Sequence, residues 1–250
     1  MLGSVLYLLL AVTSLLISAY AWDKLSADAQ QPSATQRTAI YFGCVFGLAL
    51  GAKLGYFFAE GLAIMRDATL SIGQRALQLM AGKTITGALL GAYAGVEYAK
   101  HRVGYRHATG DTFALIAPCT IAFTRLGCLA QGCCLGRPMP ASMFTLTDQH
   151  GVARWPAVPC ELGFNLAFLA FILIVLRVRR NSTPEWLQGQ LFHLYLIAYG
   201  AFRFTHEFLR DTPRWQGAWN GYHILAALLL LLGTWGFARR ATQARLAIAS

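Results

Sequence analysis

Charged residues are scarce in this chain of 250 residues, at 13% of the sequence, whereas hydrophobic residues make up 56%. No long polar segment interrupts the apolar runs, and the mean hydropathy is +0.46. This composition excludes a water-soluble domain and indicates a polytopic membrane protein with a single domain over residues 1–250. The basic residues, which give a net charge of +10, lie between the apolar runs and not along one face. We therefore expect a membrane as the partner and no nucleic acid.

Windows of roughly 20 apolar residues, enough to cross a bilayer as a helix, recur along the chain. They predict an all-α fold with seven transmembrane helices, at about residues 2–22, 39–65, 84–99, 112–134, 160–176, 190–208 and 221–238. The first run has no basic segment before it and no small-residue cleavage site after it, so we expect a retained span. The longest connection, Leu135–Pro159, carries four prolines and Trp155, which is typical of a loop at the membrane interface.

Lysine and arginine are divided unevenly between the two sets of connections. Eleven lie on one side of the predicted membrane and seven on the other, and the remaining three lie within spans. Because cytoplasmic connections carry the excess, the count places the N-terminus outside and the C-terminus in the cytoplasm. In that orientation three polar clusters, residues 83–87, 125–136 and 203–210, reach the outer face. They indicate a functional site at the outer leaflet.

The stretch from Ala122 to Pro138, AFTRLGCLAQGCCLGRP, concentrates unusual residues at the end of an apolar run. It contains Arg125 and three of the six cysteines. A charged side chain at the bilayer centre costs roughly 3 to more than 10 kcal/mol, so it normally faces a protein interior or a wet cavity and is a functional candidate. The alternative is an interfacial arginine whose guanidinium reaches the lipid headgroups.

A second constellation is in the segment YGAFRFTHEFLRDTPRW, where Arg203, Glu207 and Arg210 are spaced as i, i+4 and i+7, on one helical face. A carboxylate between two guanidiniums forms either a structural ion triad or a site in which one arginine binds phosphate. With Arg125 on the same side, the balance favours an anion site. His206 is a candidate for packing, capping or general-base chemistry.

The three clustered cysteines, Cys128, Cys133 and Cys134, allow three interpretations. Buried or disulfide-bonded cysteine is the commonest fate of this residue type, a reactive thiolate comes second because Arg125 or Arg137 could stabilise it, and a metal site comes third. The segment lacks the C-x-x-C pairs and histidines that metal sites prefer, so we expect no metal and no cofactor.

A glycine repeat, GKTITGALLGAYAG, lies in the third predicted span. Its glycines are spaced by five, four and four residues, at Gly82, Gly87, Gly91 and Gly95. This spacing allows close approach of helices, and packing alone accounts for the last two. Nearer the surface, Thr84 and Thr86 are candidates for contacts with a headgroup.

These segments together resemble the bacterial prolipoprotein diacylglyceryl transferases. Arg125-Leu-Gly, then Gly132, then Gly136-Arg-Pro is similar to the family signature, approximately G-R-hydrophobic-G-N-F-x-N-x-E-x-x-G. The resemblance extends over nearly the whole chain. Three further segments carry it, Thr86-Gly-Ala-Leu-Leu-Gly, Val158-Pro-Cys-Glu-Leu and Arg203-Phe-x-x-Glu-Phe-x-Arg.

The resemblance implies seven helices with a lateral opening to lipid and an outward-facing site in the bacterial inner membrane. There, phosphatidylglycerol would give its diacylglyceryl group to the cysteine thiol of a lipoprotein precursor and release glycerol phosphate. Arg125 and Arg203 would hold the phosphate, with Glu207 orienting Arg203. The candidate catalytic residues are Cys133, Arg125, Arg203 and Glu207, and the candidate substrate-binding residues are Thr86, Gly87, Cys128, Gln131, Gly136, Arg210 and His206.

The chain departs from the family where acid–base chemistry is expected. Cys128, Gln131 and Cys133 stand where the family has Asn, Asn and Glu, Thr86 replaces a His, and a family carboxylate falls on Phe164, with Glu161 nearby. These departures predict either a changed acceptor or changed chemistry. One form of changed chemistry is a covalent intermediate on a thiolate at Cys133. Two alternatives from other classes are a phospholipid-binding or transport protein that keeps the anion clamp, and a thiol-redox membrane protein.

Overall fold

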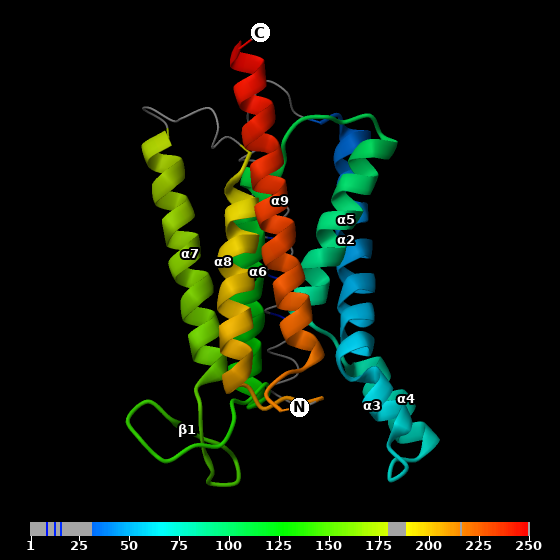
Figure 1. The fold of residues 1–250 in the computed structure, drawn as a ribbon, viewed down its shortest axis with the longest axis vertical. Coiled ribbons are helices and arrows are strands. Elements are labelled where there is room, and N and C mark those ends of the chain that lie inside the picture. Colours follow the sequence, from blue (N-terminus) through cyan, green and yellow to red (C-terminus); the bar gives the residue numbers. More distant parts are fainter. Residues whose placement is uncertain are drawn as a thin grey trace.

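The computed structural model describes residues 32–179, 189–215 and 217–249, together with the isolated positions 9, 13 and 16. The predicted first span, residues 2–22, therefore lies outside the described residues except at those three positions. The described elements are α2 Ala34–Tyr56, the π-helical turn η1 Phe57–Gly61, α3 Leu62–Arg66, α4 Ile72–Ala81, α5 Ile85–Arg102, α6 Gly110–Gln131, β1 Leu146–Thr147, β2 Ala153–Arg154, α7 Ala157–Arg179, α8 Leu191–His206, the 3₁₀ turn η3 Glu207–Leu209 and α9 Gly221–Ala249 (Figure 1).

The all-α prediction is confirmed for this part of the chain. Four of its helices are long and apolar enough to cross a membrane: Ala34–Arg66, Gly110–Gln131, Ala157–Val178 and Gly221–Thr242. The predicted spans at 84–99 and 190–208 correspond to α5 and α8. These have 18 and 16 residues, and at about 1.5 Å per residue they are shorter than a hydrocarbon core of about 30 Å. The count of seven spans and the orientation of the termini therefore remain predictions.

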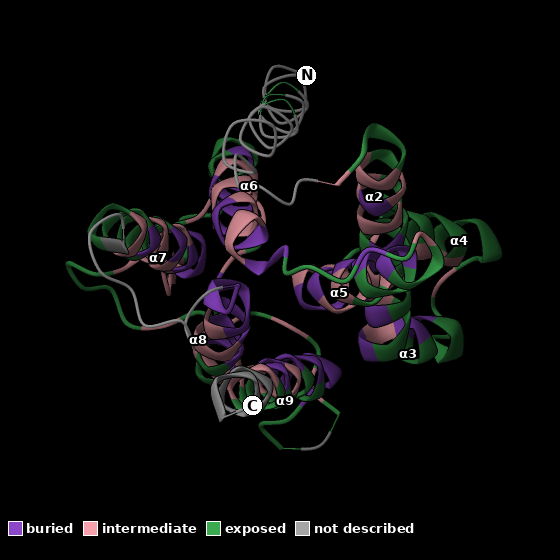
Figure 2. Cartoon of the chain, turned by 90° about the horizontal axis from the view of Figure 1, so that it is seen from above, coloured by how far each residue is buried: buried purple, intermediate pink, exposed green. Residues whose placement is uncertain are grey.

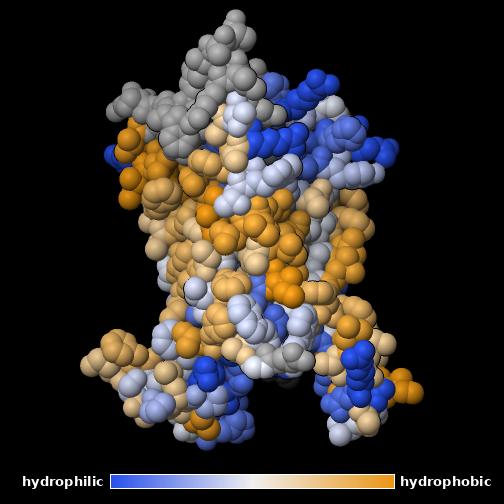
Figure 3. Space-filling model, viewed as in Figure 1, coloured by the Kyte–Doolittle hydropathy of each residue, from blue (hydrophilic) through white to orange (hydrophobic). Residues whose placement is uncertain are grey.

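The helices form two groups that lie side by side when the molecule is viewed from above (Figure 2). One group pairs α2 with α5, and the other contains α6, α7, α8 and α9. In the second group α8 packs along α9 and also contacts α6 and α7. Most of the residues of α8 are buried, among them Tyr195 and Tyr199, which are fully enclosed. Apolar side chains form a band around the middle of the face shown in Figure 3, with hydrophilic residues beyond it at both ends.

Two segments that the sequence presented as connections contain structure of their own. The Arg66–Lys83 connection holds α4, an amphipathic helix that begins at a capping box between Ser71 and Gln74. The Leu135–Pro159 connection holds a two-stranded antiparallel sheet in which Leu146 pairs with Arg154. Both segments extend from the lower end of the bundle in Figure 1.

The contact between α2 and α5 consists of two facing rows of glycine. The α5 row of Gly87, Gly91 and Gly95 lies against an α2 row of Gly43, Gly47, Gly51 and Gly55. A Cβ atom added at Gly91 would overlap the carbonyl oxygen of Gly47. The packing interpretation of Gly91 and Gly95 is confirmed, and the partner row on α2, with spacing i, i+4, i+8 and i+12, is the signal that the sequence analysis missed.

We expect Gly91→Ala to lower the free energy of unfolding by about 1–3 kcal/mol, because the new methyl group forces the two helices apart. The matched control is Gly163→Ala on α7, where an added Cβ has no atom within 4 Å. That change should be neutral or stabilise the protein by roughly 0.5–1 kcal/mol, since glycine is a poor residue within a helix. Thermal unfolding in detergent measures both, and an equal response in the two variants would contradict the close contact.

Candidate active site

Two of the three polar clusters, residues 125–136 and 203–210, meet at the lower end of the bundle in Figure 1, where α6 and α8 end and α7 and α9 begin. The end of α6 is set by Gly132, which adopts the left-handed conformation with φ of 62°. Glycine tolerates this conformation best, and it lets the N–H groups of Gly132 and Cys133 return to the last turn of the helix. The convergence predicted for residues 125–136 and 203–210 is confirmed.

Glu161, near the start of α7, is the centre of a buried ion network. One of its oxygens, Oε2, lies 2.8 Å from Arg125 Nη2 and 3.6 Å from Arg203 Nη1. Its other oxygen, Oε1, accepts a hydrogen bond of 2.6 Å from the Tyr199 hydroxyl. No more than 4% of either arginine or of Glu161 is exposed. Three helices are thus joined through one carboxylate in a place that excludes water.

Glu207 forms the second half of the network. Its Oε2 lies 2.9 Å from Arg203 Nη2 and 3.8 Å from Arg210 Nη1. Its Oε1 accepts hydrogen bonds from Thr212 and Asn220. The i to i+4 pairing of Arg203 with Glu207 is confirmed, but α8 ends at His206 and Arg210 has an extended backbone. Arg210 is therefore close to Glu207 without lying on the predicted helical face.

The network carries one excess positive charge, because three arginines share two carboxylates. Within the described part of the chain, Arg125 Nε and two nitrogens of Arg203, Nε and Nη1, are buried without a hydrogen-bond partner. Buried polar groups are normally paired, and guanidinium groups suit phosphate and carboxylate oxygens. The arrangement can therefore accept an anion.

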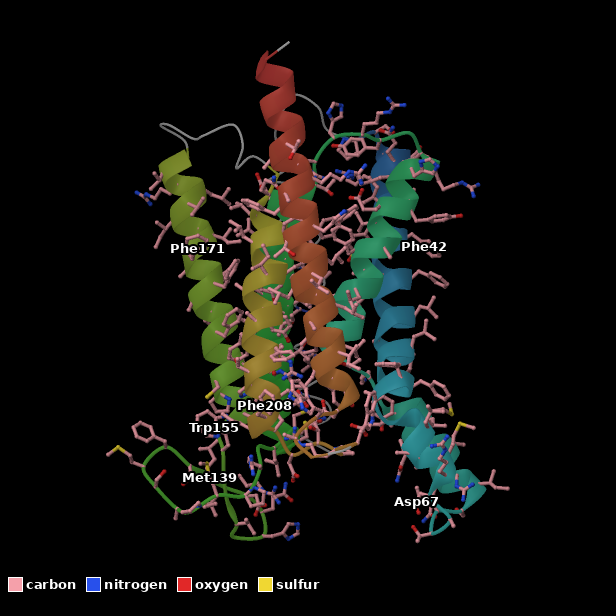
Figure 4. The ribbon with its side chains drawn as sticks, in the orientation of Figure 1. Phe42, Asp67, Met139, Trp155, Phe171 and Phe208 are labelled. Carbon is pink, nitrogen blue, oxygen red and sulfur yellow. The ribbon has the colours of Figure 1, made fainter. Side chains whose placement is uncertain are left out.

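Backbone hydrogen bonds join the segment after α6 to the segment after α8. The amide of Arg137 donates to Leu209, and the amide of Asp211 donates to Leu135. These bonds hold the two polar segments side by side. In Figure 4, Trp155 and Phe208 both lie at this end of the bundle.

The hairpin between α6 and α7 adds a polar clamp. Arg154 contacts the Gly136 carbonyl and the carboxylates of Asp148 and Asp211. Its hydrogen bond to Asp148, together with the backbone amides that point at the same carboxylate, lowers the pKa of Asp148 to about 2. Asp148 is therefore charged at neutral pH. The clamp fixes Gly136 close to the ion network.

His206 lies beside the network and not within it. Its Nε2 accepts a hydrogen bond from the indole of Trp155, and its ring stacks on Phe202. Gly136 is pressed against the backbone of the same tryptophan, which leaves no room for a side chain. These contacts are those of a packed scaffold around the arginines.

The three cysteines come together at the end of α6. Arg125 Nη1 lies 3.6 Å from the sulfur of Cys128, and the sulfur of Cys134 lies 3.9 Å from the same sulfur. Cys133 contacts Gln131 Oε1 at 3.9 Å. Cys128 thus contacts the arginine, and Cys133, which was the favoured cysteine in the sequence, contacts Gln131.

The third predicted cluster, residues 83–87, packs against α2. Thr84 and Thr86 are buried and hydrogen-bonded to each other. Gly87 lies against Gly51 and Gly55 of α2. Close helix packing accounts for Gly87, and a role of Thr86 and Gly87 in substrate binding stays a prediction.

Glu161 is the main residue whose importance the sequence analysis understated. A signal was present, because Glu161 is the only charged residue between Trp155 and Leu176. An ionisable residue within an apolar span faces a partner inside the protein. The partner on α6 could not be identified without the fold.

Comparison with known proteins supplies a family. The family model described as prolipoprotein diacylglyceryl transferase matches residues 4–239. The phosphatidylglycerol–prolipoprotein diacylglyceryl transferase of Bordetella parapertussis is 30% identical over 200 residues, which cover 78% of this chain and 70% of that protein. The protein of the same name from Polynucleobacter asymbioticus is 30% identical over 203 residues, covering 78% and 70%. The second such protein of Clostridium perfringens is 26% identical over 170 residues, covering 66% and 63%.

Proposed function

The chain belongs to the prolipoprotein diacylglyceryl transferase family and is a membrane transferase, and from that premise we propose how its own residues perform the transfer. The donor is phosphatidylglycerol in the outer leaflet of a bacterial inner membrane, and the acceptor is the cysteine thiol of a lipoprotein precursor. The names of the similar proteins support both substrates.

The observation that carries this proposal is the buried network with one excess positive charge. Arg125 and Arg203 bind the donor phosphate through their Nε atoms, which have no hydrogen-bond partner. Glu161 and Glu207 hold the two guanidiniums in place. The Arg210 side chain is 14% exposed and is the first guanidinium that an entering headgroup meets.

In the transfer, the acceptor sulfur forms a bond to the terminal glyceryl carbon while the bond from that carbon to the phosphate oxygen breaks. The electron pair leaves with glycerol phosphate, and the thiol proton passes to water. Negative charge therefore grows on the phosphate, where the two arginines stabilise it in a site with little water.

We propose that Cys133 and its neighbours Cys128 and Cys134 contact the acceptor sulfur. Cys128 lies 3.6 Å from Arg125 Nη1, and the three sulfurs lie within 4.8 Å of one another, beside the place where the phosphate binds in this proposal. A covalent intermediate on Cys133 is a poor route, because the lipid would be held in a stable thioether that a second thiol does not readily displace. The sulfurs therefore assist the acceptor and do not carry the lipid.

Four residues remain as candidates for contacts with the substrates. Gln131 and Gly136 flank the cysteines, His206 lies beside the ion network, and Thr86 is buried at the start of α5. Gly87 is accounted for by packing, as described above, and can take part only through its backbone.

We propose seven spans with the N-terminus outside, which puts the site at the outer leaflet. The basic residues support this orientation. The end of the bundle opposite the site carries Lys100 and Arg102 at the end of α5 and Arg239 and Arg240 on α9. Because basic residues mark the cytoplasmic side, the site end faces outward.

The test uses the full chain in vesicles that contain radiolabelled phosphatidylglycerol and a lipoprotein-precursor peptide with a single cysteine. We expect labelled peptide and release of glycerol phosphate. Saturable binding of lipid without product would contradict transfer by this chain and support a lipid-binding protein. A matched peptide with serine in place of cysteine should stay unlabelled.

Cys133→Ser should lower turnover by roughly 10- to 100-fold, because a serine hydroxyl does not replace the thiol that contacts the acceptor sulfur. Cys119→Ser, on α6 but away from the cluster, should retain turnover. Thermal unfolding of both variants checks that the fold is kept. Wild-type turnover in Cys133→Ser and Cys134→Ser alike would remove the thiols from the mechanism.

A further inference from the structure

The cysteine cluster has the geometry of a metal site that no part of the proposed function requires. The sulfurs of Cys128, Cys133 and Cys134 all lie within 4.8 Å of one another, and those of Cys128 and Cys134 are 3.9 Å apart. Thiolates bound to one Zn²⁺ at about 2.3 Å in a tetrahedral arrangement lie about 3.8 Å apart. The cluster is therefore close to the spacing of ligands around a single ion.

The backbone creates this cluster at the end of α6. After Gly132 turns the chain out of the helix, Cys134 adopts a φ of 60°, and it is the only residue other than glycine with a positive φ in the described ranges. This left-handed turn brings the sulfur of Cys134 back to Cys128, six residues earlier. Such a conformation is uncommon for a side chain larger than glycine, so a functional reason for it is expected.

A disulfide explains the cluster less well. The sulfurs of Cys128 and Cys134 would have to approach from 3.9 Å to about 2.05 Å, and the third thiol would be left over. Three thiols at similar separations match a three-ligand site. The segment lacks the C-x-x-C pairs and histidines that metal sites prefer. The left-handed turn nevertheless brings the three sulfurs close together, which the sequence spacing alone does not do.

We propose that Cys128, Cys133 and Cys134 bind one Zn²⁺ ion and leave its fourth position open. Three protein ligands with one open position are the arrangement of zinc sites that act on a substrate. Three thiolates and Zn²⁺ carry a net charge of −1, which Arg125 offsets from 3.6 Å. The acceptor sulfur then binds the open position as a thiolate, and the proton of the acceptor thiol passes to water. This last step rests on the proposed function.

The binding test uses the full chain in detergent after reduction with a phosphine and treatment with a chelator. Cd²⁺ is the probe, since its bonds to thiolate absorb in the ultraviolet. We expect one Cd²⁺ per chain, which Zn²⁺ displaces only in excess because thiolate ligands favour the softer ion. Cys134→Ser should weaken binding by more than the roughly 10- to 100-fold that loss of an outer-shell partner costs. Cys119→Ser and Cys44→Ser are the controls and should bind as wild type.

A second readout does not depend on the stability of the variants. In the wild-type chain, Zn²⁺ should slow alkylation of Cys133 and Cys134, measured by mass spectrometry, and should leave Cys160 unchanged. Absence of Cd²⁺ binding, or binding that persists when Cys133 and Cys134 are both serine, overturns the site.

Turnover separates the site from the proposed function. Transfer that is lost with the chelator and restored by Zn²⁺ supports the open position as the place of the acceptor sulfur. If the cysteines bind metal but the rate of transfer does not depend on Zn²⁺, the site stands and the role of the open position is overturned. Metal binding in a chain that shows no transfer under any condition keeps the site and overturns the proposed function.

Discussion

Arg203→Lys should lower kcat/KM for diacylglyceryl transfer about 100- to 1,000-fold, the loss that follows removal of one preorganised donor to a developing negative charge. Arg203 contacts two carboxylates at once, Glu161 through Nη1 and Glu207 through Nη2. A lysine ammonium is a single point charge and cannot face two carboxylates and a phosphate together. The initial rate of labelled peptide formation, with donor and acceptor varied in turn, measures the change.

The matched control for this prediction is Arg239→Lys. Arg239 lies over the ring of Trp235 on α9 at the opposite end of the bundle, with its guanidinium carbon 5.2 Å from the ring centre. That variant should transfer lipid as the wild type does. The phosphate role of Arg203 would be refuted by near-normal transfer in an Arg203→Lys protein that unfolds at the wild-type temperature.

Glu161→Gln should lower the free energy of unfolding by about 3–5 kcal/mol, the usual cost of breaking a buried ion pair by removing one partner. The amide keeps the shape of the side chain and can still accept the hydrogen bond from Tyr199. It removes the only carboxylate within 4.0 Å of Arg125 in the described ranges, and it leaves that guanidinium buried and unneutralised. Thermal or denaturant unfolding in detergent measures the loss.

The control for Glu161→Gln is Asp211→Asn. Asp211 also forms an ion pair, with Arg154 at 2.7 Å, but its side chain is 55% exposed, and Arg154 keeps Asp148 as a second partner. An ion pair with an exposed carboxylate contributes only about 0–1 kcal/mol, so this change should be small. The double variant Arg125→Met/Glu161→Gln should recover part of the lost stability, since it removes the uncompensated charge as well. Equal effects of the two single changes would show that Glu161 is not the centre of a buried network.

The sequence by itself determined which residues form helices, because an apolar run or an i to i+4 spacing is a local property of the chain. It was sufficient for the apolar core of α2 and of α5 to α9, though not for α4, for the pairing of Arg203 with Glu207, and for the family. Arg125 was identified from the cost of a charge in hydrocarbon alone. The end of α8 was placed too late, because the 3₁₀ turn at Glu207 is stabilised by Thr212 and Asn220, which follow it in the chain.

Only the tertiary structure decided which residues meet across helices. Glu161 neutralises arginines 36 residues before it and 42 residues after it, and no periodicity within one helix encodes contacts at such separations. The facing glycines of α2 and α5 are likewise a property of two segments together. The cysteine cluster depends on one left-handed residue after α6, and the backbone conformation of a single non-glycine residue is set by its surroundings. The contacts between helices were therefore decided by packing, whereas the main helices and their charged residues could be predicted from the sequence.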